Sequence, residues 1–75
     1  MNSAEFLETF QELIQADNEL SMDTPLADIE EWDSMAIMAA IAYFDVTHGK
    51  QLTFEDFSRA NVVADIAGMI PGFEK

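Results

Sequence analysis

The centre of the chain reads Glu31-Trp32-Asp33-Ser34-Met35, and here an acidic, turn-rich segment gives way to ten consecutive apolar residues, 35–44. This change predicts a helix that begins at Asp33 or Ser34. An Asp-Ser pair suits such a start, because both side chains carry oxygens that accept hydrogen bonds from the free N–H groups of a first turn. The sequence therefore places an exposed serine at the first turn of its most apolar helix.

A further helix is predicted upstream of this point. It begins at Ser3, which can cap it, and Glu5 suits the positive end of its dipole. One apolar stripe at helical spacing supports it, formed by Phe6, Leu7, Phe10, Leu13 and Ile14.

Two more helices are predicted downstream. The central helix runs to His48, where Gly49 stops it. Thr53 caps a short helix with an imperfect capping box, and a fourth helix begins at Asn61 and ends before Pro71. Strand alternation and Asn-Gly hairpin signals are absent from the sequence. We therefore expect an all-α fold, a small four-helix bundle with three main helices, one short helix and a long loop between the first and second.

The predicted loop, residues 17–33, holds seven of the fifteen acidic residues and a turn signal at Asp23-Thr24-Pro25. A loop of this length in so small a domain requires a reason. We expect its four scattered apolar side chains to fix it across the helices, namely Leu20, Met22, Leu26 and Ile29.

The central helix carries more apolar residues than one buried face needs. At 100° per residue, four side chains are expected to face the core, namely Ile37, Ile41, Phe44 and His48. Others point largely elsewhere, namely Met35, Met38, Ala39, Ala42 and Val46. Adaptable methionines on an exposed face indicate a docking surface. The alternative is that the alanines only favour the helix.

The composition indicates one small acidic domain, residues 1–75. Fifteen acidic and three basic residues give a net charge of −12, which repels nucleic acid and suits basic protein partners. The alternative is that the charge only maintains solubility. The N-terminus lacks a signal-peptide pattern, and the longest apolar run is about half of a membrane span. We therefore expect a soluble, cytoplasmic monomer without membrane contact.

The side chains offer little chemistry of their own. Without cysteine, the chain has no thiol nucleophile and no thiolate metal site. The sole histidine, His48, lies about 21 Å along the helix from Ser34 and cannot act as its base. The acids lack calcium-loop spacing; a weak cation site near Glu30, Glu31 and Asp33 stays open beside the favoured alternative of a solvated loop. We predict no catalytic residue, no metal ligand and no enzyme.

Taken together, these features resemble the acyl carrier protein family, including its peptidyl and aminoacyl relatives. The likeness covers nearly the whole chain: a first helix, a long acidic loop, Asp33-Ser34-Met35 opening the second helix, and two further helices. Met35 stands where the family motif Asp-Ser-Leu has leucine. The resemblance implies a bundle of the acyl-carrier type in a stand-alone carrier.

In that family a phosphopantetheinyl transferase attaches 4′-phosphopantetheine from coenzyme A to the serine, so the resemblance implies that Ser34 is the attachment site. The thiol of the arm then carries an acyl or aminoacyl thioester to acyl-loading and acyl-processing enzymes, which have basic or apolar docking patches. The resemblance also implies a set of partner-recognition residues, namely Asp33, Met35, Met38, Glu30, Glu31 and Trp32.

Two departures from the family affect the expected partners. Ala36 and Ala39 stand at positions that are often acidic in fatty-acid carriers, so docking should rest more on apolar contact and on the loop acids. Trp32 stands where many relatives have a smaller residue, and it either braces the loop or contacts the arm. Both favour a specialised lipid, polyketide or related pathway over general fatty acid biosynthesis. The alternatives are an aminoacyl or peptidyl carrier and an unmodified acidic interaction module.

The sequence leaves open whether cargo enters the bundle. A fatty-chain pocket and an ordinary hydrophobic core would use the same side chains, with the core as the favoured alternative. They are Ile41, Phe44, Leu52, Phe57, Val63 and Ile66.

Overall fold

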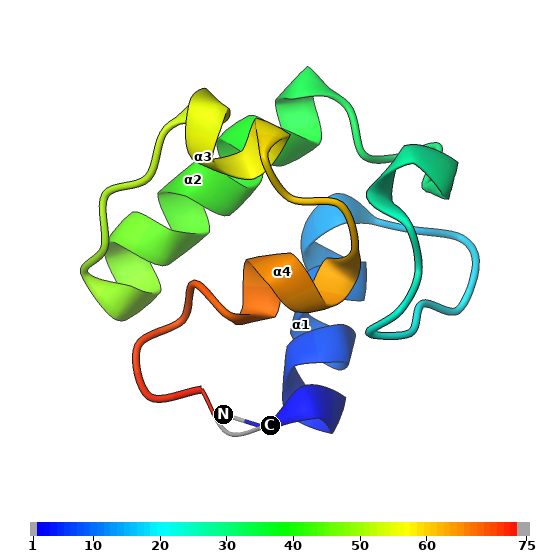
Figure 1. The fold of residues 1–75 in the computed structure, drawn as a ribbon, viewed down its shortest axis with the longest axis horizontal. Coiled ribbons are helices and arrows are strands. Elements are labelled where there is room, and N and C mark those ends of the chain that lie inside the picture. Colours follow the sequence, from blue (N-terminus) through cyan, green and yellow to red (C-terminus); the bar gives the residue numbers. More distant parts are fainter. Residues whose placement is uncertain (1, 74–75) are drawn as a thin grey trace.

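The fold comes from a computed structural model that describes residues 2–73. These residues form four α-helices and one turn of 3-10 helix: α1 (Ser3–Ile14), η1 (Leu26–Asp28), α2 (Ser34–His48), α3 (Phe54–Ser58) and α4 (Val63–Ala67). Figure 1 shows how the four α-helices are arranged. Within residues 2–73 there is no β-strand, and the pairing of Pro25 with Val62 is an isolated bridge. The all-α prediction, the bounds of α2 and the long first loop are confirmed. In the described part of the chain, no helix is long and apolar enough to cross a membrane.

The prediction of three main helices is wrong, because α4 has only five residues. The N–H groups of its first two residues, Val63 and Ala64, donate to the carbonyls of Thr24 and Met22 in the first loop. Val62 stays extended (φ −128°, ψ 166°), so the helix starts later than Asn61. After Gly68 the chain continues in turns, which still bury Ile70 in the core.

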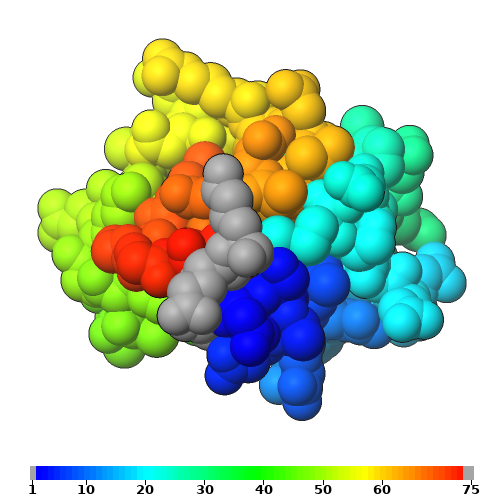
Figure 2. Space-filling model, turned by 60° about the horizontal axis from the view of Figure 1, so that its bottom comes forward, coloured from blue at the N-terminus to red at the C-terminus, as the bar shows by residue number. Residues whose placement is uncertain are grey.

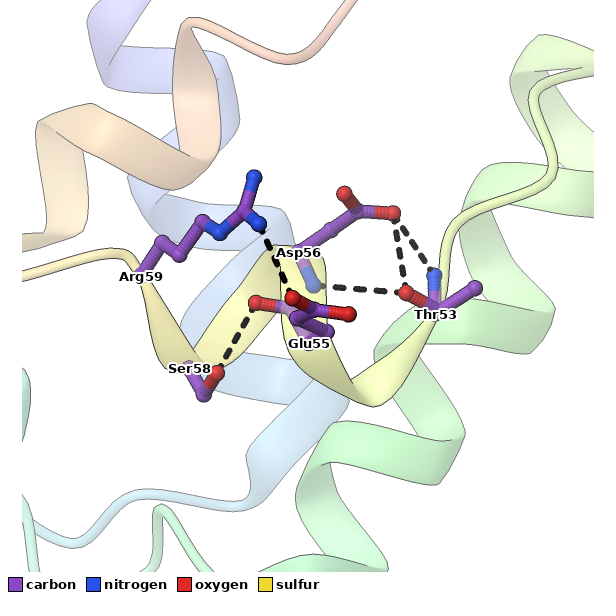
Figure 3. Close-up of polar contacts among 5 residues, drawn as sticks. All are labelled: Thr53, Glu55, Asp56, Ser58 and Arg59. Carbon is purple, nitrogen blue, oxygen red and sulfur yellow. Dashed lines mark hydrogen bonds and ion pairs between the residues drawn. The ribbon is translucent and has the colours of Figure 1, made fainter.

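Two helix starts are closed by reciprocal capping boxes. The side chain of Asn2 accepts from the N–H of Glu5 at 2.9 Å, and Glu5 accepts from the N–H of Asn2 at 3.2 Å. The predicted start of α1 at Ser3 is confirmed, but its cap is Asn2, so the prediction of Ser3 as the cap was wrong by one residue. Thr53 and Asp56 form the second box, shown in Figure 3, and the predicted cap of α3 is confirmed.

A row of aromatic rings connects the helices through the core. Phe10 of α1 lies 5.5 Å from Trp32, Trp32 lies 6.0 Å from Phe57 of α3, and Phe57 lies 5.8 Å from Phe44 of α2, measured between ring centroids. Phe6 extends the row along α1, 5.4 Å from Phe10. These edge, tilted and stacked contacts stabilise the core beyond simple burial.

The buried face of α2 is rotated from the predicted one. Ala36, Ala40 and Phe44 are buried, which confirms Phe44 as a core residue. Ile37, Ile41 and His48 are half-buried: Ile37 and Ile41 pack against the edge of the core, and His48 contacts the ring of Phe44. Small alanines let the backbone of α2 approach its neighbours closely, and the larger isoleucines occupy the edge of the contact. The buried residues of α2 recur at helical spacing, as predicted, but the size of the side chains decides which of them are buried.

The first loop is held across the bundle as predicted. Leu20, Leu26 and Ile29 are buried, and Met22 is half-buried against them. The N–H of Leu26 also donates to the carbonyl of Asn61 at 2.9 Å. Figure 1 shows this segment running beside the chain that enters α4.

The beginning and the end of the described chain meet on one face. Figure 2 shows the start of α1 in blue close to the segment after α4, drawn in orange and red. Phe73 contacts Phe6 edge to face, with 6.0 Å between the ring centroids. This contact closes the bundle on the side opposite the start of α2.

Candidate functional site

The first turn of α2 leaves two backbone donors unused. Asp33 is the N-cap: its Oδ1 accepts from the N–H of Ala36 at 2.9 Å, and its carbonyl accepts from the N–H of Ile37 at 3.0 Å. No acceptor within residues 2–73 binds the N–H of Ser34 or of Met35. Two free donors at the positive end of a fifteen-residue helix favour an anion.

The hydroxyl of Ser34 points to solvent at this turn. The side chain is exposed, and no group of the described chain hydrogen-bonds to its oxygen. His48 is at the opposite end of α2, where its Nε2 lies 3.3 Å from the hydroxyl of Tyr43, whose pKa is raised by burial. His48 is therefore too far from Ser34 to act as its base.

The acidic residues before Ser34 are not assembled into a metal site. Within residues 2–73 no group of three or more histidine or acidic side chains is arranged to hold a metal ion, so Glu30, Glu31 and Asp33 do not form the cation site left open above. Glu31 has a different contact: its Oε2 accepts from the N–H of Asp17 at 3.0 Å. This bond joins the two ends of the loop, and no local sequence pattern indicated it.

Trp32 lies between the loop and the core. Its half-buried ring contacts Phe10 and Phe57, from α1 and α3. Of the two roles considered for Trp32, these contacts support bracing of the loop. The position of Ser34 is thus set by a capped helix on one side and an anchored indole on the other.

The outer face of α2 is largely apolar in its first two turns. We define it by five exposed residues, namely Met35, Met38, Ala42, Asp45 and Val46; Ser34 and Thr47, at the two ends of the helix, are also exposed. Met35 is 78% exposed, Met38 59% and Val46 85%. Ala39, expected on this face, is instead half-buried at its edge. Ala36 is buried, so its lack of charge meets a packing requirement and says nothing about docking.

Beside Ser34, a surface groove of about 350 Å³ separates the end of α1 from the start of α2. Its lining includes Leu13 of α1 and the C-cap Gln15, Glu31 and Asp33 of the loop, and Ala39 of α2. The groove combines apolar walls with two carboxylates, next to the proposed attachment point. The sequence analysis did not find it, because it depends on how two distant segments meet.

The six residues considered for a fatty-chain pocket do not lie around one chamber. Phe44, Phe57, Val63 and Ile66 are fully buried within the core, at 0–1% exposure. Ile41 and Leu52 line a different surface groove, of about 410 Å³, beside the chain that leads from α2 to α3. These residues therefore fit the alternative of an ordinary hydrophobic core better than a pocket for a fatty chain.

The comparisons give this chain no relative from which a role can be transferred. A scan of protein-family models and searches of curated proteins and of solved structures found no match.

Proposed function

We propose that this chain is a carrier protein of the acyl-carrier type that bears 4′-phosphopantetheine on Ser34. The observation that carries the proposal is the exposed, unbonded hydroxyl of Ser34 beside two unused N–H groups, at the start of a long helix that follows an acidic loop. The order of four helices and a long first loop is compatible with such a bundle.

The residues at this turn fit the group. In the proposed reaction the oxygen of Ser34 bonds to the phosphorus that carries the pantetheine half of coenzyme A, the pyrophosphate bond breaks, and the nucleotide half leaves. The transferase supplies the base that takes the serine proton. The unused N–H groups of Ser34 and Met35 and the positive end of the α2 dipole would stabilise the resulting phosphodiester anion. The arm supplies the thioester chemistry that a chain without cysteine lacks.

The outer face of α2 is the proposed docking surface for the transferase and for the acyl-loading and acyl-processing enzymes. Exposed methionines adapt to differently shaped apolar patches, as a carrier that serves several partners requires. Four acidic residues lie near Ser34, namely Asp28, Glu30, Glu31 and Asp33. They favour partners whose docking patch has a basic rim. The proposed cargo is an acyl group of a specialised lipid, polyketide or related pathway.

Intact-mass spectrometry tests the attachment. We expect a broad-specificity phosphopantetheinyl transferase with coenzyme A to add one phosphopantetheine to the wild-type protein and none to Ser34→Ala. Ser58→Ala is the matched control, because Ser58 is also exposed and on a helix but at the end of α3. An unmodified wild type, or equal labelling of Ser34→Ala, would falsify the proposal.

One observation favours a second function: the net charge of −12, together with the exposed methionines of α2, suits an unmodified acidic module that binds a basic partner with an apolar patch. The same experiment separates the two, since the module requires no labelling of Ser34. An aminoacyl or peptidyl carrier is distinguished next, by loading the modified protein with acyl or aminoacyl substrates.

A further inference from the structure

The groove between α1 and α2 is an open hollow on the surface of the bundle. Its volume of about 350 Å³ leaves room for an extended chain to lie along it. It lies where α1 ends at Ile14 and its C-cap Gln15 takes the left-handed conformation (φ 55°), so that the chain turns away, and the small side chain of Ala39 leaves the space open. The bond from Asp17 to Glu31 holds the loop ends beside it.

The polar side chains of the groove are the carboxylates of Glu31 and Asp33, which only accept hydrogen bonds, and the amide of Gln15, which both donates and accepts. Glu31 uses Oε2 for the N–H of Asp17 and Asp33 uses Oδ1 for the N–H of Ala36, so Glu31 Oε1 and Asp33 Oδ2 have no partner within residues 2–73. No basic side chain lines the groove. Its best occupant is therefore an elongated molecule that combines N–H or O–H donors with apolar segments.

We propose that this groove is the resting site of the pantetheine arm attached to Ser34, an inference that rests on the proposed function. Asp33 and Met35, the two neighbours of Ser34 in the chain, both line the groove, so an attached arm starts at its rim. Pantetheine provides what the groove accepts: amide and hydroxyl donors for the two carboxylates, and methyl groups for the apolar walls. Attachment makes this contact intramolecular and raises its effective concentration.

The location of Met35 connects the resting arm to partner docking. Met35 lines the groove and is also part of the outer face of α2. A partner enzyme that covers Met35 therefore competes with the arm for the same side chain. Docking would release the arm into the partner, while the free carrier keeps it against α1.

Isotope-filtered NMR tests the resting site without any activity measurement. The isotope-labelled protein is modified enzymatically with unlabelled coenzyme A, and contacts from the pantetheine methyl groups are recorded. We expect nuclear Overhauser effects to Leu13 and Ala39, and amide shifts at Gln15 and Glu31 between the unmodified and modified forms. Ala39→Leu fills the groove and should abolish these contacts. Ala42→Leu, the same change on the outer face of α2, should preserve them.

The outcomes separate the two proposals. If mass spectrometry shows a modified wild type whose methyl contacts are missing or fall elsewhere, the resting site is refuted and the carrier function stands. If the wild type is never modified, both proposals fail. Contacts from the pantetheine methyl groups that persist in Ala39→Leu also refute the groove as the resting site of the arm. The wild-type contacts decide the question by themselves if the Ala39→Leu protein does not fold.

Discussion

Replacing Trp32 by alanine tests whether this residue braces the first loop against the core or serves to recognise partner proteins. The half-buried indole contacts Phe10 at 5.5 Å and Phe57 at 6.0 Å, so the substitution removes two aromatic pairs, each about 0.5–1.5 kcal/mol. Truncation of a fully buried Trp or Phe costs about 3–5 kcal/mol, and half-burial reduces this to about 2 kcal/mol. For a domain of this size, that loss lowers Tm by roughly 8–16 °C.

Thermal unfolding followed by far-ultraviolet circular dichroism measures this effect, because the signal does not depend on tryptophan. Trp32→Phe is the matched control: it keeps a ring between Phe10 and Phe57 and should lose about half as much stability. Modification of Ser34, measured well below Tm, should stay near the wild-type rate in both variants. A fall in Tm below about 3 °C for Trp32→Ala, or a large loss of modification at unchanged stability, would refute the bracing role.

Three further predictions concern a cap, a carboxylate and the docking surface. Asp33→Ala should lower the free energy of unfolding in urea by about 1 kcal/mol, because it removes the cap of α2. Asp33→Asn should retain most of that stability, because asparagine also caps helices. Equal losses of stability in the two variants would contradict the capping role. Two backbone hydrogen bonds lower the pKa of Asp65 below its usual 3.8, so its contribution to stability is present above that pH and disappears as pH falls through the lower folded pKa. Acid unfolding should therefore show the difference between wild type and Asp65→Ala shrinking below pH 3.8; a constant difference would argue against this linkage. Met35→Ser and Met38→Ser should each change stability by less than about 0.5 kcal/mol because both side chains are exposed, yet slow transfer to Ser34; unchanged transfer kinetics in both would exclude the outer face of α2 as the docking surface.

Local sequence signals predicted those parts of the fold that neighbouring residues determine. The bounds of α2 followed from Asp33 and Gly49, and the cap of α3 followed from Thr53 with Asp56 three residues on. The exposed serine followed from its position at a helix start. Each of these features depends on residues within one or two turns, which is the range that capping and periodicity report.

Features that depend on contacts between distant segments could not be predicted. The length of α4 is set by carbonyls of the first loop, which no pattern near Asn61 reveals. The buried face of α2 follows the size of Ala36 and Ala40 rather than hydrophobicity alone. The groove beside Ser34 forms where the end of α1 meets the start of α2, with the loop ends joined by the hydrogen bond from Asp17 to Glu31.

The bonds from Val63 and Ala64 to the carbonyls of Thr24 and Met22 have a consequence for the order of folding. A five-residue helix is far too short to persist alone, so α4 can form only after the first loop has reached its place. Because contacts between segments this far apart in the sequence cost more loop-closure entropy than local helix contacts, α1 and α2 should form first and α4 last. Amide hydrogen exchange at Val63 and Ala64 would then report every opening of the loop that precedes Ser34.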